Sequence, residues 1–351
     1  MTDPEKSARA ATDPGARLRG RLESFVIESA ALRGNVLGDP HHREVLVYLP
    51  PSYDASSTTR FPVVTILAPY AATNRSIVNW RLWEPSTFEL YESLLARGEA
   101  QEAILVSPDC CNRWGGSQFL DSSASGRYQT HVADEVLPAV DARYRTIAER
   151  AGRAVVGRSS GGFGALRIAL DRPELFAVIG SHAGDGLFEV SIRPTFTSIA
   201  ITLDREGDLA AFLERFERTG PRGGGDFETI AMIATAAAYA PEPGAPFPHL
   251  ALPFDPSTGL PIEATWQRFL DHDPVVRLER EPDALRDAAL VFLDAGDRDE
   301  HGLQFAARRM AALLRARGAA VRHEEFPGGH RGTHARYAVS LPLLIGALAR
   351  S

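Results

Sequence analysis

The hydrophobic positions of this 351-residue chain fall into short continuous runs, separated by segments with helical periodicity. The runs predict buried strands over residues 44–50, 61–68, 103–107, 153–157, 177–181, 289–294 and 320–326. Apolar residues at helical spacing predict helices over 87–97, 128–142, 162–170 and 302–317, the last one capped by Gly318. Continuous apolar strands that alternate with helices are typical of a mostly parallel sheet covered on both faces. The pattern therefore predicts an α/β fold.

One long segment, residues 186–282, interrupts this alternation. It contains the pieces GPRGGGD and PEPGAPFPHLALPFDPSTGLP and a single apolar helix pattern over 229–239. Because it predicts no strands, we interpret it as an insertion in a single domain of residues 21–351, preceded by a disordered polar leader over 1–20. Insertions of this length often cover active sites, so we expect a cap; the alternative is an excursion without contact to the site.

Composition and charge exclude several classes of partner. The net charge of -7 argues against binding to nucleic acid or to an anionic membrane surface. No apolar run approaches the roughly 18 residues of a membrane span, and the first residues lack the apolar core of a secretory signal. Two neighbouring cysteines, Cys110 and Cys111, cannot build a disulfide framework or a zinc site. We expect a cytoplasmic protein.

A glycine-rich turn follows the predicted strand over 153–157. Its letters GRSSG, residues 157–161, match the pattern G-x-S-x-G with Ser159 at the centre, whereas Ser160 fails the pattern because Arg158 occupies its first glycine position. A tight strand-to-helix turn exposes the serine Oγ, and its glycines avoid clashes. Ser159 is therefore the candidate nucleophile, and the alternative is a structural turn. The N–H of Ser160 would lie at a helix N-terminus, where negative charge is favoured.

Partners for this serine are expected at the ends of later strands. The strand ALVFLDAG is followed by Asp297, Asp299 and Glu300, and the strand AVRHEEFP is followed by a glycine pair and His330. The order serine, acid, histidine is the order of the triad in α/β-hydrolases. We predict His330 as the base, with His334 as the alternative, and Asp299 as the acid, ahead of Asp297 and then Glu300.

With these residues in place, the chain resembles the esterase family of α/β-hydrolases, which includes S-formylglutathione hydrolases, enterobactin esterases, feruloyl esterases and mycolyltransferases. The resemblance covers about residues 40 to 350 and rests on VLVYLPPSYD, FPVVTILA, AILVSPD, GGSQFLDSSASGRY, VDARYRT, GRSSGGFGALRIAL, LDAGDRDEHGL and FPGGH. It implies the α/β-hydrolase fold with a lid-like insertion. In the family pattern G-x-x-D-E the acid three residues after the glycine is catalytic, which corresponds here to Asp299, counted from Gly296.

The chain departs from the family at the loop that usually supplies one donor of the oxyanion hole. The family carries H-G-x-G-G or a related glycine pair, whereas residues 67–72 read LAPYAA. Pro69 has no N–H to donate, but the donor normally comes from the following residue, Tyr70. The resemblance therefore implies an oxyanion hole formed by the backbone N–H groups of Tyr70 and Ser160.

These features together predict a serine hydrolase that cleaves a carboxylic ester through an acyl-enzyme, with a small-molecule ester as substrate and no cofactor or metal. Trp114 and Gln118, in and beside the motif GGSQF, are possible substrate contacts. Two alternatives remain open at this point. An acyltransferase or tailoring enzyme would pass the acyl group to an alcohol or amine, and a binding protein would keep the fold without turnover.

Overall fold

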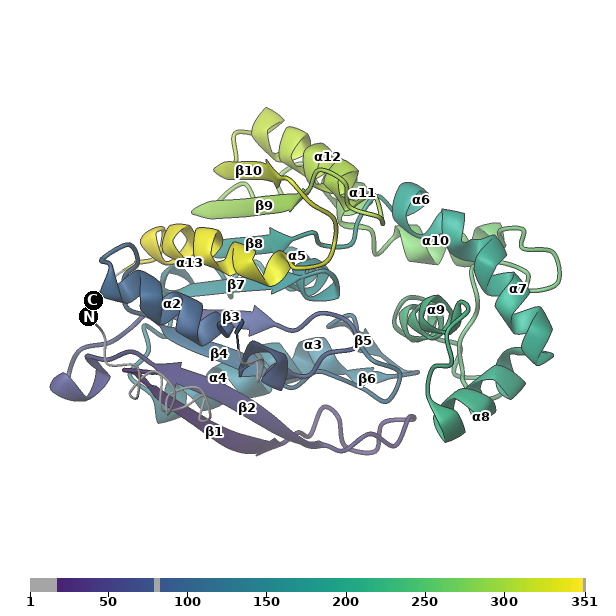
Figure 1. Cartoon of the computed structure of the whole chain (residues 1–351), viewed down its shortest axis with the longest axis horizontal. Coiled ribbons are helices and arrows are strands. Elements are labelled where there is room, and N and C mark those ends of the chain that lie inside the picture. The colour runs from purple at the N-terminus through teal and green to yellow at the C-terminus, as the bar shows by residue number, and fades with distance from the viewer. Residues whose placement is uncertain (1–17, 79–82, 350–351) are drawn as a thin grey trace.

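A central eight-stranded sheet forms the body of the molecule (Figure 1). The computed structural model describes residues 18–78 and 83–349. In spatial order the strands are β1 (Arg21–Glu28), β2 (His42–Leu49), β4 (Ile104–Pro108), β3 (Val63–Leu67), β7 (Arg153–Arg158), β8 (Val178–His182), β9 (Leu290–Gly296) and β10 (Val321–Phe326). The pairs β1–β2 and β2–β4 are antiparallel and all others are parallel, which confirms the predicted mostly parallel sheet.

Helices cover both faces of this sheet, because the apolar side chains of its strands alternate between the two sides. Val64 and Ile66 of β3 belong to the core between the sheet and the helices α2 (Thr87–Ala96) and α13 (Tyr337–Gly346). These two helices lie in front of the sheet in Figure 1. Leu67 belongs to the core of the opposite face. The helices of that face are α3 (Tyr128–Thr130), α4 (Leu137–Arg143), α5 (Ser160–Asp171), α11 (Pro274–Arg280) and α12 (Leu303–Ala316). A short hairpin of β5 (Asp121–Ser122) and β6 (Gly126–Arg127) stands apart from the sheet.

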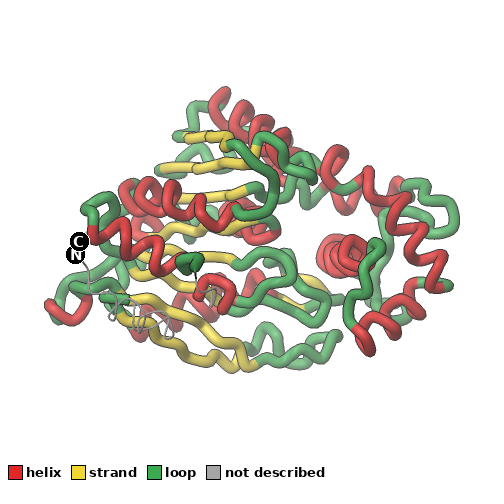
Figure 2. The backbone as a smooth tube through the Cα atoms, viewed as in Figure 1, coloured by secondary structure: helices red, strands yellow, loops and turns green. Residues whose placement is uncertain are grey.

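The segment predicted as an insertion is mainly helical. It forms α6 (Phe188–Ser191), α7 (Phe196–Glu206), α8 (Leu209–Thr219), α9 (Asp226–Tyr239) and α10 (Glu263–Leu270) before α11. The group from α6 to α10 lies beyond the carboxyl ends of the parallel strands (Figures 1 and 2). Its apolar core continues into the sheet domain through Trp114 and Phe163. Of these helices, only α9 was predicted from the sequence, over residues 229–239.

The elements that were not predicted include β1 and α13, each for a physical reason. Side chains of β1 alternate between exposed and half-buried along an edge strand, so no continuous apolar run marks it. Helix α13 is apolar over most of its length and contains Pro342, which breaks the usual helix signal. Of the predicted leader, residues 1–17 lie outside the described part, while the N–H groups of Arg19 and Gly20 donate to the Glu92 carboxylate.

Within residues 18–78 and 83–349, none of the helices has both the length and the apolar character needed to cross a bilayer. Cys110 and Cys111 are free thiols, the first buried and the second half-buried.

Candidate active site

Ser159 occupies the sharp turn between β7 and α5, with φ of +56° and ψ of -126°. Such a conformation is costly for a residue with a side chain and persists only where the surroundings enforce it. A Cβ on Gly157 would lie 2.2 Å from the carbonyl carbon of Gly161, and one on Gly161 would lie 2.2 Å from the Leu67 carbonyl oxygen. The glycines of the G-x-S-x-G pattern are therefore required by close backbone contacts, as the sequence indicated.

The structure brings Ser159, His330 and Asp299 together in one hydrogen-bonded chain. The Oγ of Ser159 lies 2.9 Å from Nε2 of His330, and Nδ1 of His330 lies 2.8 Å from Oδ2 of Asp299. Because a carboxylate only accepts, Nδ1–H donates to it, and Nε2 is left to accept the serine proton. The Asp299 side chain is completely buried, whereas 19% of the His330 side chain is exposed. This arrangement holds an oriented base against a serine hydroxyl.

Asp299 is ionised, and a carboxylate is the form that can accept the Nδ1–H of His330 and so orient its ring. Burial works to raise the pKa of this carboxyl, but the hydrogen bond from His330, and the charge of that ring whenever it is protonated, work against it. The N–H of His301 adds a further hydrogen bond, at 2.9 Å to Oδ1. Together these contacts hold the pKa of Asp299 below its ordinary value, so the group is a carboxylate throughout the neutral range.

The other two acids of the cluster hold the loop that carries His330. Asp297 Oδ1 accepts the Gly328 N–H at 2.9 Å, and Glu300 Oε2 accepts the His330 N–H at 2.7 Å. Neither carboxylate bonds the imidazole. The alternative base, His334, lies in a turn with its Nε2 4.0 Å from Glu84 instead of Ser159. From the sequence, Asp297 and Glu300 were considered only as alternatives to Asp299 for the catalytic acid, because no pattern in a single sequence shows that a residue anchors a loop.

A second set of serine, histidine and aspartate lies inside the protein. His182 Nδ1 is 2.7 Å from Asp294 and its Nε2 is 2.8 Å from Ser340. Arg336 also donates to Asp294, at 2.7 Å. All members of this Ser340–His182–Asp294 set are at most 1% exposed, so no substrate reaches the hydroxyl. We interpret it as a buried polar network that joins β8, β9 and α13.

The loop after β3 comes close to the Ser159 turn, because the Leu67 carbonyl faces Gly161. In this loop the N–H of Tyr70 forms no hydrogen bond with the described residues, whereas the N–H of Ala71 donates to the Gly115 carbonyl at 2.7 Å. Ala71 has a φ of +59°, so an alanine adopts a left-handed conformation where the family usually has glycine. Ser160 begins α5, and its N–H has no intrahelical partner. Neither predicted oxyanion donor thus has a hydrogen-bond partner in the described part of the chain.

The side chain of Tyr70 joins three segments. Its hydroxyl donates to the Trp114 carbonyl at 2.5 Å, and its ring stands edge-on to Phe227 of α9 at 5.4 Å. A Cβ on Gly115 or Gly116 would come within 3 Å of the same ring, which explains why two glycines begin GGSQF. Burial raises the pKa of the phenol, so Tyr70 remains a neutral donor.

We expect Tyr70→Phe to lower kcat/KM by less than about tenfold, because the backbone N–H that we assign to the oxyanion hole is kept. The variant loses one hydrogen bond to the Trp114 carbonyl, a contribution of about 1 kcal/mol to stability. Steady-state kinetics and thermal unfolding measure both effects. A loss of activity comparable to removal of the nucleophile would show instead that the phenol takes part in the chemistry.

The two possible substrate contacts lie between the sheet domain and the insertion. Trp114 is 1% exposed and packs against Phe247 with ring centroids 6.0 Å apart. Gln118 has a φ of +53°, and its amide nitrogen donates to Thr235 of α9 at 3.2 Å. Its amide oxygen is buried without a hydrogen-bond partner among the described residues. Both side chains connect the GGSQF loop to the insertion, and a contact with substrate stays a prediction.

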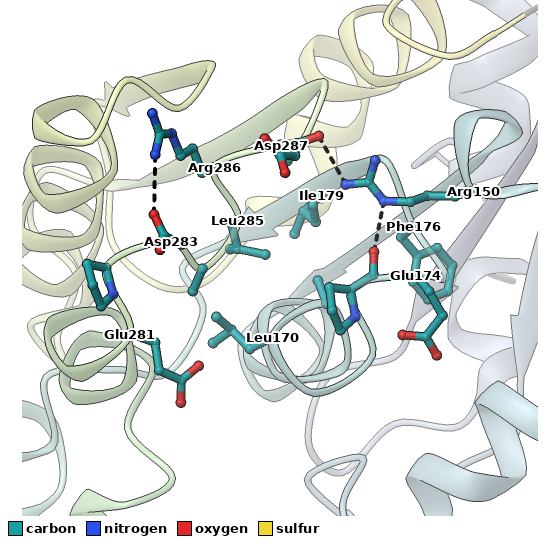
Figure 3. A pocket seen from close by; sticks show the side chains of 15 residues that line it. Arg150, Leu170, Glu174, Phe176, Ile179, Glu281, Asp283, Leu285, Arg286 and Asp287 are labelled. Carbon is teal, nitrogen blue, oxygen red and sulfur yellow. Dashed lines mark hydrogen bonds and ion pairs between the residues drawn. The ribbon is translucent and has the colours of Figure 1, made fainter.

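Two further features lie away from Ser159. A cavity of about 600 Å³, drawn in Figure 3, is lined by Leu170, Phe176, Ile179 and Leu285 among others. Leu170 lies at the far end of α5, roughly 15 Å along the helix from its start. Among the residues described, Glu28, His41 and His42 bring donor atoms within 4.8 Å of one another, as a metal ion would require. Glu28, however, already pairs with Arg33 at 2.5 Å. Neither feature is part of the Ser159 site.

His272, in the insertion between α10 and α11, makes stability depend on pH. Burial, aided by the charge of Arg167, lowers the pKa of His272 to about 4, and the ring stacks on Tyr239 at 4.8 Å. A depressed histidine pKa means that the unfolded chain binds the proton first, so stability falls as the pH drops from about 6.5 to about 4. The expected loss is at most about 3 kcal/mol. Between pH 7 and pH 4.5, the free energy of unfolding measured with urea should fall less in His272→Phe than in the unaltered protein. An equal fall in the two proteins would contradict this.

Comparisons with known proteins place the chain among esterases. A family model described as putative esterase matches residues 40–342. Two Mycobacterium tuberculosis proteins named as esterases are 40% identical over 82 residues, which span 23% of this chain and only 18% of their own length. A ferulic acid esterase structure covers 94% of this chain and 98% of its own at 18% identity, with a TM-score of 0.60. An S-formylglutathione hydrolase from Agrobacterium tumefaciens covers 94% and 96% at 16% identity, with a TM-score of 0.57. At these identities the structures show a shared fold.

Proposed function

The chain belongs to the putative esterase family, and on that premise we propose that it is a serine hydrolase that cleaves a carboxylic ester through an acyl-enzyme. The observation that supports this most strongly is the chain of hydrogen bonds from Ser159 through His330 to Asp299, with distances of 2.9 and 2.8 Å. The three residues follow β7, β10 and β9, whose carboxyl ends meet at one edge of the sheet. Strained backbone at the serine is a common property of catalytic nucleophiles.

In the proposed mechanism Ser159 Oγ attacks the ester carbonyl while Nε2 of His330 takes its proton. The imidazolium then gives this proton to the leaving alcohol, the ester C–O bond breaks, and the acyl group stays on Ser159. Water attacks the acyl-enzyme with His330 again as base, which releases the acid and restores the serine. Asp299 keeps Nδ1–H directed at itself and stabilises the charged imidazolium. The N–H groups of Tyr70 and Ser160 bind the oxyanion.

The helices of the insertion are proposed as a cap that sets substrate preference. They lie beyond the strand ends that carry the triad, and α9 contacts the loops of Tyr70 and Gln118 through Phe227 and Thr235. A substrate at Ser159 would therefore lie between the sheet edge and these helices.

Turnover of p-nitrophenyl esters of increasing acyl length tests the proposed function. We expect hydrolysis with a preference for one range of chain length, and loss of turnover in His330→Ala. Product analysis with and without added alcohols then separates hydrolysis from acyl transfer: the free acid as the only acyl product under all conditions would count against transfer. Absence of any turnover would contradict the proposal and favour a binding protein on a hydrolase fold.

A further inference from the structure

The loop that carries His330 is rich in glycine. It runs from the end of β10 to a short 3-10 helix, Thr333–Arg336, and three of the residues between these elements are glycines. Gly328 has a φ of +147° and Gly332 a φ of +78°, values that residues with a side chain rarely adopt. Such a backbone does not hold an imidazole in place by itself. Because a catalytic group must stay within about 0.5 Å of its productive position, contacts from outside the loop have to fix His330.

On the C-terminal side of His330, this contact comes from Thr333. The side chain of Thr333 belongs to a residue that is 1% exposed, and its hydroxyl donates a hydrogen bond to the His330 carbonyl at 3.3 Å. The same hydroxyl accepts a hydrogen bond from the guanidinium of Arg158, also at 3.3 Å. A hydroxyl has one proton to donate and lone pairs to accept with, so both of its functions are used. Thr333 therefore connects Arg158 to the backbone of the base.

Arg158 is the last residue of β7 and directly precedes the nucleophile. Its backbone is paired with His182 of β8, and the N–H of Ser159 donates to the His182 carbonyl at 2.8 Å. Within the described residues, the guanidinium of Arg158 forms no hydrogen bond other than the one to Thr333. The contacts thus close a ring: Ser159 Oγ meets Nε2 of His330 on one side, and the Arg158–Thr333 bridge reaches the His330 carbonyl on the other.

A separate anchor holds the far end of the loop. Arg336, the last residue of the 3-10 helix, donates to the buried carboxylate of Asp294 at 2.7 Å. This ion pair keeps the 3-10 helix on the sheet whether or not the Thr333 hydroxyl is present. Because Gly332 lies between this anchor and His330, the ion pair does not fix the imidazole. The Arg158–Thr333 bridge can therefore be removed while the rest of the loop stays attached.

We propose that Thr333, bound by Arg158, is a positioning residue that keeps the imidazole of His330 in line with the Ser159 hydroxyl. The bridge fixes the backbone of the base relative to the backbone of the nucleophile, and so preserves the 2.9 Å contact between Nε2 and Oγ. Thr333 is buried and acts through His330. Since a misplacement of about 1 Å can cost about 10²-fold in rate, loss of the bridge should slow the chemistry more than it weakens substrate binding. The proposal rests on the proposed serine hydrolase function.

Two substitutions of Thr333 test this with a p-nitrophenyl ester. Thr333→Val keeps nearly the same shape and removes the hydroxyl, and we expect kcat to fall about tenfold or more. KM should stay within about threefold, because His330 is the base in both acylation and deacylation. Thr333→Ser keeps the hydroxyl and should retain kcat within about threefold of the unaltered protein. Thr65→Val is the control: this β3 threonine is buried and its hydroxyl has no partner among the described residues, so kcat should not change.

A double-mutant cycle tests whether Arg158 acts through Thr333. Arg158→Met removes the guanidinium and keeps an unbranched side chain, so kcat should fall to a similar extent as in Thr333→Val. Because both changes break one bridge, the variant that carries both should lose little more than the larger of the two single losses. Losses that multiply would show that the two residues act independently and would overturn the bridge.

The rate at which a serine-directed fluorophosphonate labels Ser159, measured per folded molecule, separates positioning from a purely structural role. We expect this rate to fall with kcat in Thr333→Val and to be retained in Thr333→Ser. Unchanged kcat and labelling rate in Thr333→Val would overturn the positioning role, while turnover by the unaltered protein still supports the proposed function. If Thr333→Val does not fold, the same two measurements on Arg158→Met decide. Absence of turnover by the unaltered protein would remove the proposed function and this inference with it.

Discussion

Replacing Ser159 by alanine is expected to lower kcat for ester hydrolysis by about 10⁵- to 10⁶-fold. The change removes the only atom that can form the acyl-enzyme, whereas oxyanion donors and cap remain, so KM should change little. The fold should be kept, because the Ser159 side chain has no hydrogen bond with the described residues other than that to His330, and alanine has the same backbone freedom as serine at φ +56°. Steady-state kinetics with a p-nitrophenyl ester and a thermal unfolding curve measure both results.

Ser160→Ala is the matched control for this experiment. Ser160 is 3% exposed and is assigned a role through its backbone N–H, which alanine retains. We expect it to keep kcat within about tenfold of the unaltered protein, because removal of a backbone donor, not of the side chain, is what costs about 10² to 10³. Comparable losses from the two changes would contradict the assignment of the nucleophile.

Asp299→Asn should lower kcat by about 10⁴-fold. The amide can donate a hydrogen bond to Nδ1 of His330, which favours the tautomer whose Nε2 carries a proton and cannot accept one from Ser159. The change also removes the buried negative charge that stabilises the imidazolium. Asparagine has nearly the shape of aspartate and would be buried to the same extent. The loss of kcat therefore measures the change in the His330 tautomer and in the charge. Burst and steady-state kinetics at pH 7 measure it.

Asp297→Asn and Glu300→Gln are its controls, since each keeps an oxygen that can accept the N–H of Gly328 or His330. We expect each to retain kcat within about tenfold. If either control loses as much activity as Asp299→Asn, the catalytic acid has been assigned to the wrong member of the cluster.

Local sequence could predict those parts of the site whose residues are fixed by steric demands. Gly157 and Gly161 lie against other backbone atoms, so any serine nucleophile in this turn requires them at that spacing. The strands were predicted because burial on both faces gives continuous apolar runs. Edge strand β1 and helix α13 lack such a run or contain a proline, and they emerged only from the structure.

Contacts between residues that are far apart in the chain were harder to predict from the sequence. The order of residues limited the acid to three candidates, but only packing decides that Asp299 bonds the imidazole while Asp297 and Glu300 hold its loop. The hydrogen bond from Gln118 to Thr235 joins a loop of the sheet domain to α9, more than a hundred residues later in the chain. No local pattern encodes such a contact, because each residue taken alone fits an ordinary loop or core position.

The central claim is that Ser159 is a nucleophile activated by His330. Its most direct test is mass spectrometry of the folded protein after reaction with a serine-directed fluorophosphonate. We predict a single adduct per chain on the peptide that contains Ser159, absent from Ser159→Ala and strongly slowed in His330→Ala. An adduct on another residue, or no adduct in a folded protein that still hydrolyses esters, would contradict the account.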